Sequence, residues 1–135
     1  MQSISPETLF RGNYAWEKSL PQIIKLTKRP LILGRGIHTN NLRNKIFIDL
    51  KNHNLNVNSA NLQFDCCYED ISRIKKIILK NNHDSVIAAG GGKVLDAGKY
   101  IADCLNISCI TALSAPLHVQ DGQPYRIFTQ KMDNL

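Results

Sequence analysis

The sequence contains few of the residues that hold metal ions or cross-link a chain. It has four cysteines and four histidines in 135 residues, and no two cysteines have CxxC spacing. Zinc ribbons and zinc fingers are therefore excluded. The adjacent residues Cys66 and Cys67 would allow a redox role, but buried, unreactive thiols are the commoner use of cysteine in a reduced compartment. We expect all four cysteines to be packing residues.

Long hydrophobic runs are also missing. No apolar stretch approaches the length of a transmembrane helix, and residues 1–7 show no basic region followed by an apolar core. These absences predict a cytoplasmic protein without a membrane partner.

Acidic residues are in deficit, since 11 aspartates and glutamates face 17 lysines and arginines, for a net charge of +6. The basic residues are nevertheless dispersed, and only the segment 73–80 clusters them, opposite a stripe of isoleucines. Aromatic residues make up only 7% of the chain. Without a nucleic-acid-binding motif or an aromatic platform, no nucleic-acid partner is predicted. An anionic small ligand suits the charge equally well.

What the chain does contain is a regular alternation of strand and helix signals. Its length predicts one domain over residues 1–135, with a lead-in at 1–12 and a hairpin and tail at 117–135. Short apolar runs predict strands, and apolar residues at helical spacing predict helices. The strands are expected at 31–33, 62–65, 85–89 and 108–113, with an edge strand at 8–12. The helices are expected at 20–28, from a cap at Thr39 to residue 50, at 69–80, and from the glycines at 90–92 to residue 105.

This alternation predicts an α/β fold, with a Rossmann-like, mainly parallel sheet and helices on both faces. A C-terminal β-hairpin is expected in addition, with strands at 117–120 and 123–128 around the turn Asp121-Gly122. Pro6 and Gly12 discourage regular structure near the start of the chain, and residues 130–135 carry no strong signal.

The most informative stretch runs from Ser85 to Ala102, where a buried strand, a glycine triplet and an amphipathic helix follow one another. Gly90, Gly91 and Gly92 let a ligand approach the main chain, and the free N–H groups of the helix point into the same space. Such a place attracts phosphate. The alternative is a tight turn with no ligand, but Lys93 at the helix start favours phosphate binding. The spacing differs from the GxGxxG fingerprint.

A second apolar strand ends in Gly34-Arg35-Gly36, and a third ends at Ser114. In parallel α/β sheets, ligands bind beyond the carboxyl ends of the strands. The three strand ends are therefore expected to line one cleft.

The run Gly90-Gly91-Gly92-Lys93-Val94-Leu95-Asp96-Ala97-Gly98-Lys99, placed after an upstream strand ending in glycine, resembles a known pattern. It is similar to the N-terminal domain of the glycerol dehydrogenase and iron-containing alcohol dehydrogenase family, and the likeness covers residues 8 to about 116. The resemblance implies NAD or NADP bound with its pyrophosphate against Gly90, Gly91 and Gly92.

The resemblance also implies contacts beyond the pyrophosphate. It places Asp96 and Lys99 near the nicotinamide end of the cleft, and makes Thr111 and Ser114 candidates for cofactor contact. The alternative for Asp96 is an acidic residue favourably placed in the first helical turn and paired with Lys93 or Lys99. A solvated surface lysine is the corresponding alternative for Lys99.

The chain departs from the family pattern after its first glycine-ended strand. Many family members carry an acidic residue there, which holds the adenosine ribose, whereas this chain has Gly34 and Arg35. Arg35 could pair with a 2′-phosphate, which favours NADP, or it could be an ordinary loop cation.

In the family, a metal that polarises the alcohol is held by a second, helical domain that these residues do not match. No metal is expected on this chain alone, and the isolated chain is expected to bind the cofactor with little or no turnover. A homo-oligomer or a complementary chain carrying the metal domain would then be its protein partner. The competing hypotheses are a truncated cofactor-binding domain of a dehydrogenase, a noncatalytic nucleotide-binding or protein-interaction module, and a site for another phosphorylated metabolite.

Overall fold

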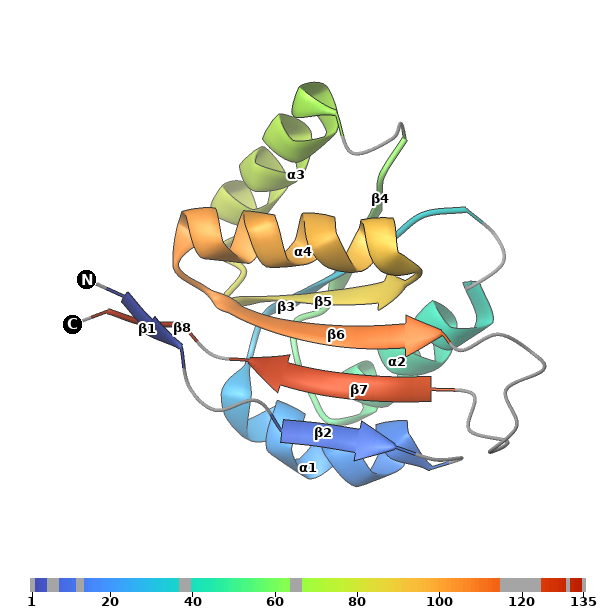
Figure 1. Cartoon of the computed structure of the whole chain (residues 1–135). Coiled ribbons are helices and arrows are strands. Elements are labelled where there is room, and N and C mark those ends of the chain that lie inside the picture. The colour runs from blue at the N-terminus through green and yellow to red at the C-terminus, as the bar shows by residue number, and fades with distance from the viewer. Residues whose placement is uncertain are drawn as a thin grey trace.

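Parallel strands form the centre of the fold, shown in Figure 1 as a computed structural model. The structure describes residues 2–4, 8–11, 14–36, 40–63, 67–114, 125–130 and 132–134, and the side chains of residues 14–36, 40–63 and 67–113. The parallel strands are β4 (Asn58–Asn61), β3 (Pro30–Gly34), β5 (Ser85–Gly90) and β6 (Ser108–Ser114). Antiparallel strands β7 (Tyr125–Gln130) and β2 (Thr8–Arg11) extend the sheet, in the order β2-β7-β6-β5-β3-β4.

Helices cover both faces of this sheet (Figure 1). One face carries α1 (Ala15–Leu26) and α2 (Asn40–Asn52), and the other carries α3 (Tyr68–Asn81) and α4 (Gly92–Leu105). Every residue of β3 and β5 is buried, because alternate side chains pack against opposite helix pairs. Ile32 and Ile87 face α1 and α2, whereas Leu31 and Val86 face α3 and α4. The predicted Rossmann-like, mainly parallel α/β fold is confirmed.

Local signals act at the ends of α3 and α4. Both helices end at an asparagine in the left-handed conformation, Asn82 with φ 55° and Asn106 with φ 56°, and each cap N–H returns to the last turn. Gly98 lets α4 lie close to β5, since a Cβ there would come within 2.6 Å of the Cβ of Ala88. The middle of α4 therefore packs closely against β5.

The first helix begins earlier than predicted. Helix α1 starts at Ala15 instead of residue 20, and Pro21 lies in its interior. The prediction was wrong because burial of Ala15 and Trp16 outweighs the poor fit of proline inside a helix. The Ser19 hydroxyl, also buried, donates to the carbonyl of Trp16 at 2.8 Å.

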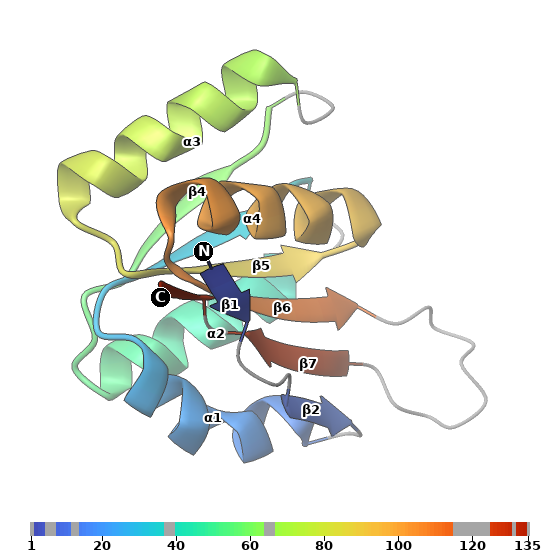
Figure 2. The same cartoon turned by 60° about the vertical axis from the view of Figure 1, so that its left-hand side comes forward.

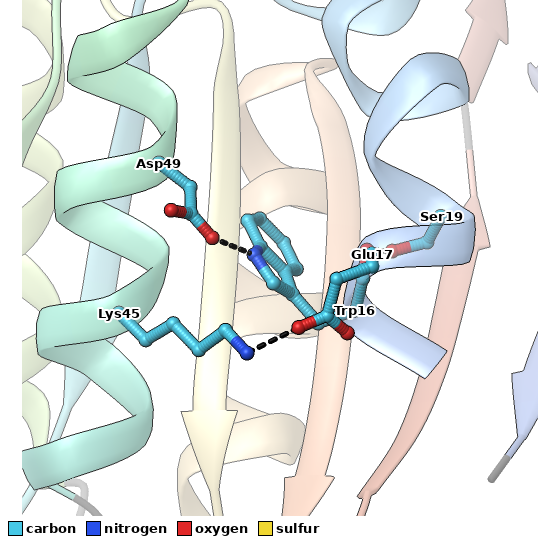
Figure 3. Close-up of polar contacts among 5 residues, drawn as sticks. All are labelled: Trp16, Glu17, Ser19, Lys45 and Asp49. Atoms are coloured by element: carbon cyan, nitrogen blue, oxygen red, sulfur yellow. Dashed lines mark hydrogen bonds and ion pairs between the residues drawn. The ribbon is translucent and has the colours of Figure 1, made fainter. Parts of the chain in front are cut away.

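Polar contacts tie α1 to α2 at this point (Figure 3). The Trp16 indole Nε1 donates to Asp49 Oδ2 at 2.7 Å, and the Lys45 ammonium pairs with Glu17. Trp16 is itself 1% exposed and packs in the core below the sheet. Its indole thus buries an apolar body while its one polar atom keeps a partner.

The prediction of a strand at 62–65 is wrong in position, because the strand lies at 58–61. The strand on this edge is β4, which pairs with β3 from Leu31↔Asn58 to Gly34↔Asn61, while Leu62 and Gln63 follow it outside regular structure. Residues 64 and 65 lie outside the described part of the chain. Three of the four β4 side chains are exposed, so an edge strand here needs no apolar pattern.

The expectations for the chain ends are partly confirmed and partly wrong. The edge strand expected at 8–12 is present as β2. Residues expected to lack structure instead form a second sheet, in which β1 (Gln2–Ile4) pairs with β8 (Met132–Asn134). Figure 2 shows this small sheet at the amino ends of the parallel strands, with the two chain termini together. Pairing between opposite ends of a chain leaves no local signal to recognise.

The structure describes only part of the predicted C-terminal hairpin. Strand β7 overlaps its second predicted strand, and the two edges of β7 are paired with β6 and β2. Residues 115–124, with the predicted Asp121-Gly122 turn and Pro124, lie outside the described residues.

Among the described helices, none combines the length and the apolar character that crossing a membrane requires.

Candidate functional site

The carboxyl ends of three parallel strands meet at one edge of the sheet. Pairing aligns Leu33 of β3 with Ala88 of β5, and Ala88 in turn with Thr111 of β6. The turns after β3 and β5 and the last residues of β6 therefore begin at one level, on the side where the arrowheads of β5 and β6 end in Figure 1. This is the edge at which α/β folds bind ligands.

The glycine triplet makes the sharp connection from β5 to α4. Gly90 has a φ of 153°, which residues with a side chain rarely adopt. Gly91 is the N-cap of α4, with φ −87° and ψ −175°, and Gly92 is the first residue of the helix. A Cβ built on Gly91 or Gly92 would have no described heavy atom within 4 Å. The main chain here borders open space as far as the described residues extend.

The start of α4 has the features of an anion site. Gly91 has no side chain to cap the helix, and no acidic residue lies in the first turn. The first N–H groups of the helix have no intrahelical partner, and the helix dipole places partial positive charge beside them. Exposed Lys93 adds a full positive charge in the same turn. These residues fit a phosphate group, which needs donors, positive charge and room to approach.

The turn after β3 is shaped by a residue that the sequence analysis did not select. Arg43 of α2 is 6% exposed, and its Nη2 donates to the carbonyl of Gly36 at 2.6 Å. Burial lowers the pKa of the Arg43 guanidinium from its usual value. The signal was present in the spacing, because Arg43, Ile46 and Leu50 all lie on the buried side of α2. Arg35, at the centre of the turn, is half-buried.

Asp96 and Lys93 lie together in a groove between α3 and α4. The groove has a volume of about 600 Å³. Its other lining residues include exposed Tyr68 and Tyr100, and the Lys75 ammonium lies 5.5 Å from the centre of the Tyr100 ring. Lys99 is exposed but does not line this groove. The cofactor contacts expected of Asp96 and Lys99 stay predictions.

The two candidates on β6 lie at different depths. Thr111 is 3% exposed and sits within the sheet, between Ala88 and Phe128. Ser114 is the last residue of β6, one step beyond the pair Gly90↔Leu113, so its backbone reaches the level of the glycine turn. The side chain of Ser114 is outside the described part of the structure.

The cysteines differ from one another. Cys109 is buried beneath α4, and burial raises the pKa of its thiol to about 12, so it is an unreactive packing residue as expected. Cys104 is exposed, so its prediction as a packing residue is wrong, because it lies on the outer face of α4. Cys67 is half-buried, and Cys66 falls outside the described residues. In the described parts of the chain, no three His, Cys, Asp or Glu side chains are grouped as a metal site would require.

The sequence of this chain is similar to those of known alcohol and glycerol dehydrogenases. A family model described as iron-containing alcohol dehydrogenase matches residues 6–126. The chain is 29% identical over 125 residues to glycerol-1-phosphate dehydrogenase (NAD(P)+) of Metallosphaera sedula, and 26% identical over 107 residues to glycerol dehydrogenase 1 of Schizosaccharomyces pombe. These matches cover 89% and 78% of this chain, but only 34% and 24% of the two relatives. The chain thus spans about a third and about a quarter of their lengths.

Solved structures show the same fold. The crystal structure of glycerol dehydrogenase from Schizosaccharomyces pombe superposes with a TM-score of 0.67 and 22% identity, over 76% of this chain and 26% of that one. NADH-dependent butanol dehydrogenase A from Thermotoga maritima superposes with a TM-score of 0.56 and 19% identity, over 67% and 24% of the two chains. At these identities the likeness establishes the fold alone.

Proposed function

The chain belongs to the iron-containing alcohol dehydrogenase family, and from this premise we propose that it binds NAD or NADP with the cofactor pyrophosphate against Gly90, Gly91 and Gly92. The supporting observation is the glycine turn itself. It ends a fully buried parallel strand, opens onto free space, and starts a helix that has no capping side chain and no acid in its first turn. A bound pyrophosphate would accept hydrogen bonds from the free N–H groups there.

The rest of the proposed cofactor site lies along the same edge. The adenosine ribose would face the turn Gly34-Arg35-Gly36, since β3 is the neighbour of β5 on that side. The nicotinamide would lie toward the end of β6, near Ser114, with Thr111 behind it in the sheet. Lys93 would pair with the phosphates, and Asp96 and Lys99 remain proposed contacts from α4.

The oxidised cofactor would accept a hydride from an alcohol or polyol, and the reduced cofactor would donate one to the corresponding carbonyl compound. The chain's own part would be to hold and orient the dinucleotide at this edge of the sheet. We propose that metal ligands for the alcohol come from another segment or another chain, because these residues match only 34% and 24% of the relatives' lengths. The isolated chain should then bind the cofactor and turn over little or no alcohol.

Calorimetric titration of the purified chain with NADH and NADPH tests this function directly. We expect binding in the micromolar range, because the phosphate-binding elements are present on this chain. Inorganic pyrophosphate serves as a competitor, and it should displace the dinucleotide if the glycine turn holds the phosphates. Absence of binding to both cofactors would contradict the proposal and favour a noncatalytic interaction module of the same fold.

A second prediction concerns the choice between the two cofactors. Replacing Arg35 with alanine should weaken NADPH binding about tenfold and leave NADH nearly unchanged, because only NADPH carries the 2′-phosphate that a guanidinium can hold. Titration of the variant with each cofactor measures the ratio. Equal losses for NADH and NADPH would identify Arg35 as an ordinary cation of the turn.

A further inference from the structure

The side chain of Arg43 lies directly across the turn that follows β3. A Cβ built on Gly34 would come within 2.2 Å of both Cδ and Nε of Arg43, and within 2.5 Å of Cζ. A side chain at position 34 would therefore have to displace the Arg43 side chain, although the backbone angle of Gly34 is not an unusual one. The guanidinium fills the place where any other residue at position 34 would put its side chain.

The same side chain also holds the far end of the turn. Its Nη2 donates to the carbonyl of Gly36 at 2.6 Å, and Gly36 has a φ of 71°, a left-handed conformation in which glycine carries little strain. One arginine thus contacts both ends of the three-residue segment Gly34-Arg35-Gly36. Arg35 lies between these two glycines, so the contacts of Arg43 fix the main chain that carries the Arg35 side chain.

This braced turn stands beside the proposed phosphate site. Leu33 pairs with Ala88, so the residues after Leu33 run level with those that lead into Gly90. Arg43 itself is 6% exposed and comes from α2, beneath the turn. It is placed to act through the turn and not to touch a ligand above it.

We propose that Arg43 is a positioning residue that sets the conformation of Gly34-Arg35-Gly36 and, through it, the relative affinity of this chain for NADPH and NADH. The proposal rests on the proposed function for its cofactor. It adds that discrimination between the cofactors depends on a buried side chain that makes no contact with either of them. Planar guanidinium geometry suits this role, because its several N–H groups bond in fixed directions.

A double-mutant cycle tests the contact from both sides. Arg43→Ala removes the brace, and Gly34→Ala should displace the Arg43 side chain while leaving it in the chain. Each single change should reduce the NADPH-to-NADH affinity ratio about tenfold, as for Arg35→Ala. In the Arg43→Ala background, Gly34→Ala should have no further effect, because the clash is gone. Additive losses, or an unchanged ratio in either single variant, would overturn the proposal.

A measurement without cofactor separates this inference from the proposed function. Arg43→Met keeps much of the apolar stem but loses the hydrogen bond to Gly36. It should speed amide hydrogen exchange at Leu62, whose N–H donates to the Gly34 carbonyl at 2.8 Å, by about tenfold while β5 stays protected. Arg43→Lys, which keeps a donor and the charge, should restore part of the protection. Unchanged exchange in the methionine variant would overturn the bracing role. If the unaltered chain binds neither cofactor, the proposed function fails and the selectivity role with it, whatever the exchange rates.

Discussion

Replacing Gly91 with aspartate is expected to weaken binding of NADH and NADPH by about 30-fold or more. A carboxylate at the N-cap of α4 would occupy the open space beside the turn and face the pyrophosphate. Two unit charges about 4 Å apart repel by about 4 kcal/mol at an effective dielectric constant near 20. Even half of this repulsion, after screening by solvent, weakens binding about 30-fold. Calorimetric titration with each cofactor measures the loss.

The controls for this variant separate charge from folding. Aspartate is a favourable N-cap, so Gly91→Asp should unfold at the same urea concentration as the unaltered chain, or a higher one. Gly91→Asn has nearly the same size without the charge, and it should retain more affinity than the aspartate variant. Affinity of Gly91→Asp equal to that of the unaltered chain would remove the phosphate from this turn.

Replacing Trp16 with alanine is expected to have the largest effect on stability. The indole is 1% exposed and packs against the core beneath the sheet, so its loss leaves a cavity. Truncation of a buried tryptophan of this kind lowers the free energy of unfolding by about 3–5 kcal/mol. Since a whole domain is stable by only about 5–15 kcal/mol, the variant should lose from a fifth of its stability to all of it. Urea denaturation followed by circular dichroism measures the change.

Trp16→Phe is the matched control. It keeps most of the buried apolar surface but loses the Nε1 hydrogen bond to Asp49 drawn in Figure 3. We expect a loss of about 1–2 kcal/mol, clearly smaller than for alanine. Adding Asp49→Ala to the Trp16→Phe variant should lower its stability little further, because the hydrogen bond between the two side chains is already absent. If the alanine and phenylalanine variants are equally stable, then the apolar packing of Trp16 is not what holds α1 to the sheet.

The sequence by itself determined the repeated strand–turn–helix units and the position of the glycine turn. These features depend on neighbouring residues. The apolar side chains of β5 favour burial on both faces of a sheet, and the positive φ at Gly90 favours a residue without a side chain. Asn82 and Asn106 end their helices because asparagine tolerates the left-handed conformation. Such preferences can be recognised one segment at a time, and the cofactor site proposed at Gly90–Gly92 follows from them.

Only the tertiary structure decided the features that depend on distant partners. Pro21 lies inside a helix because Trp16 is buried in the core, and β4 forms with Ala60 as its one apolar residue because β3 offers it an unpaired edge. Strands β1 and β8 pair across the whole length of the chain. Arg43 contacts Gly34 and Gly36 only because α2 folds back beneath β3. In each case the favourable contact exists only once the two segments are already side by side, so no short stretch of sequence can reveal it.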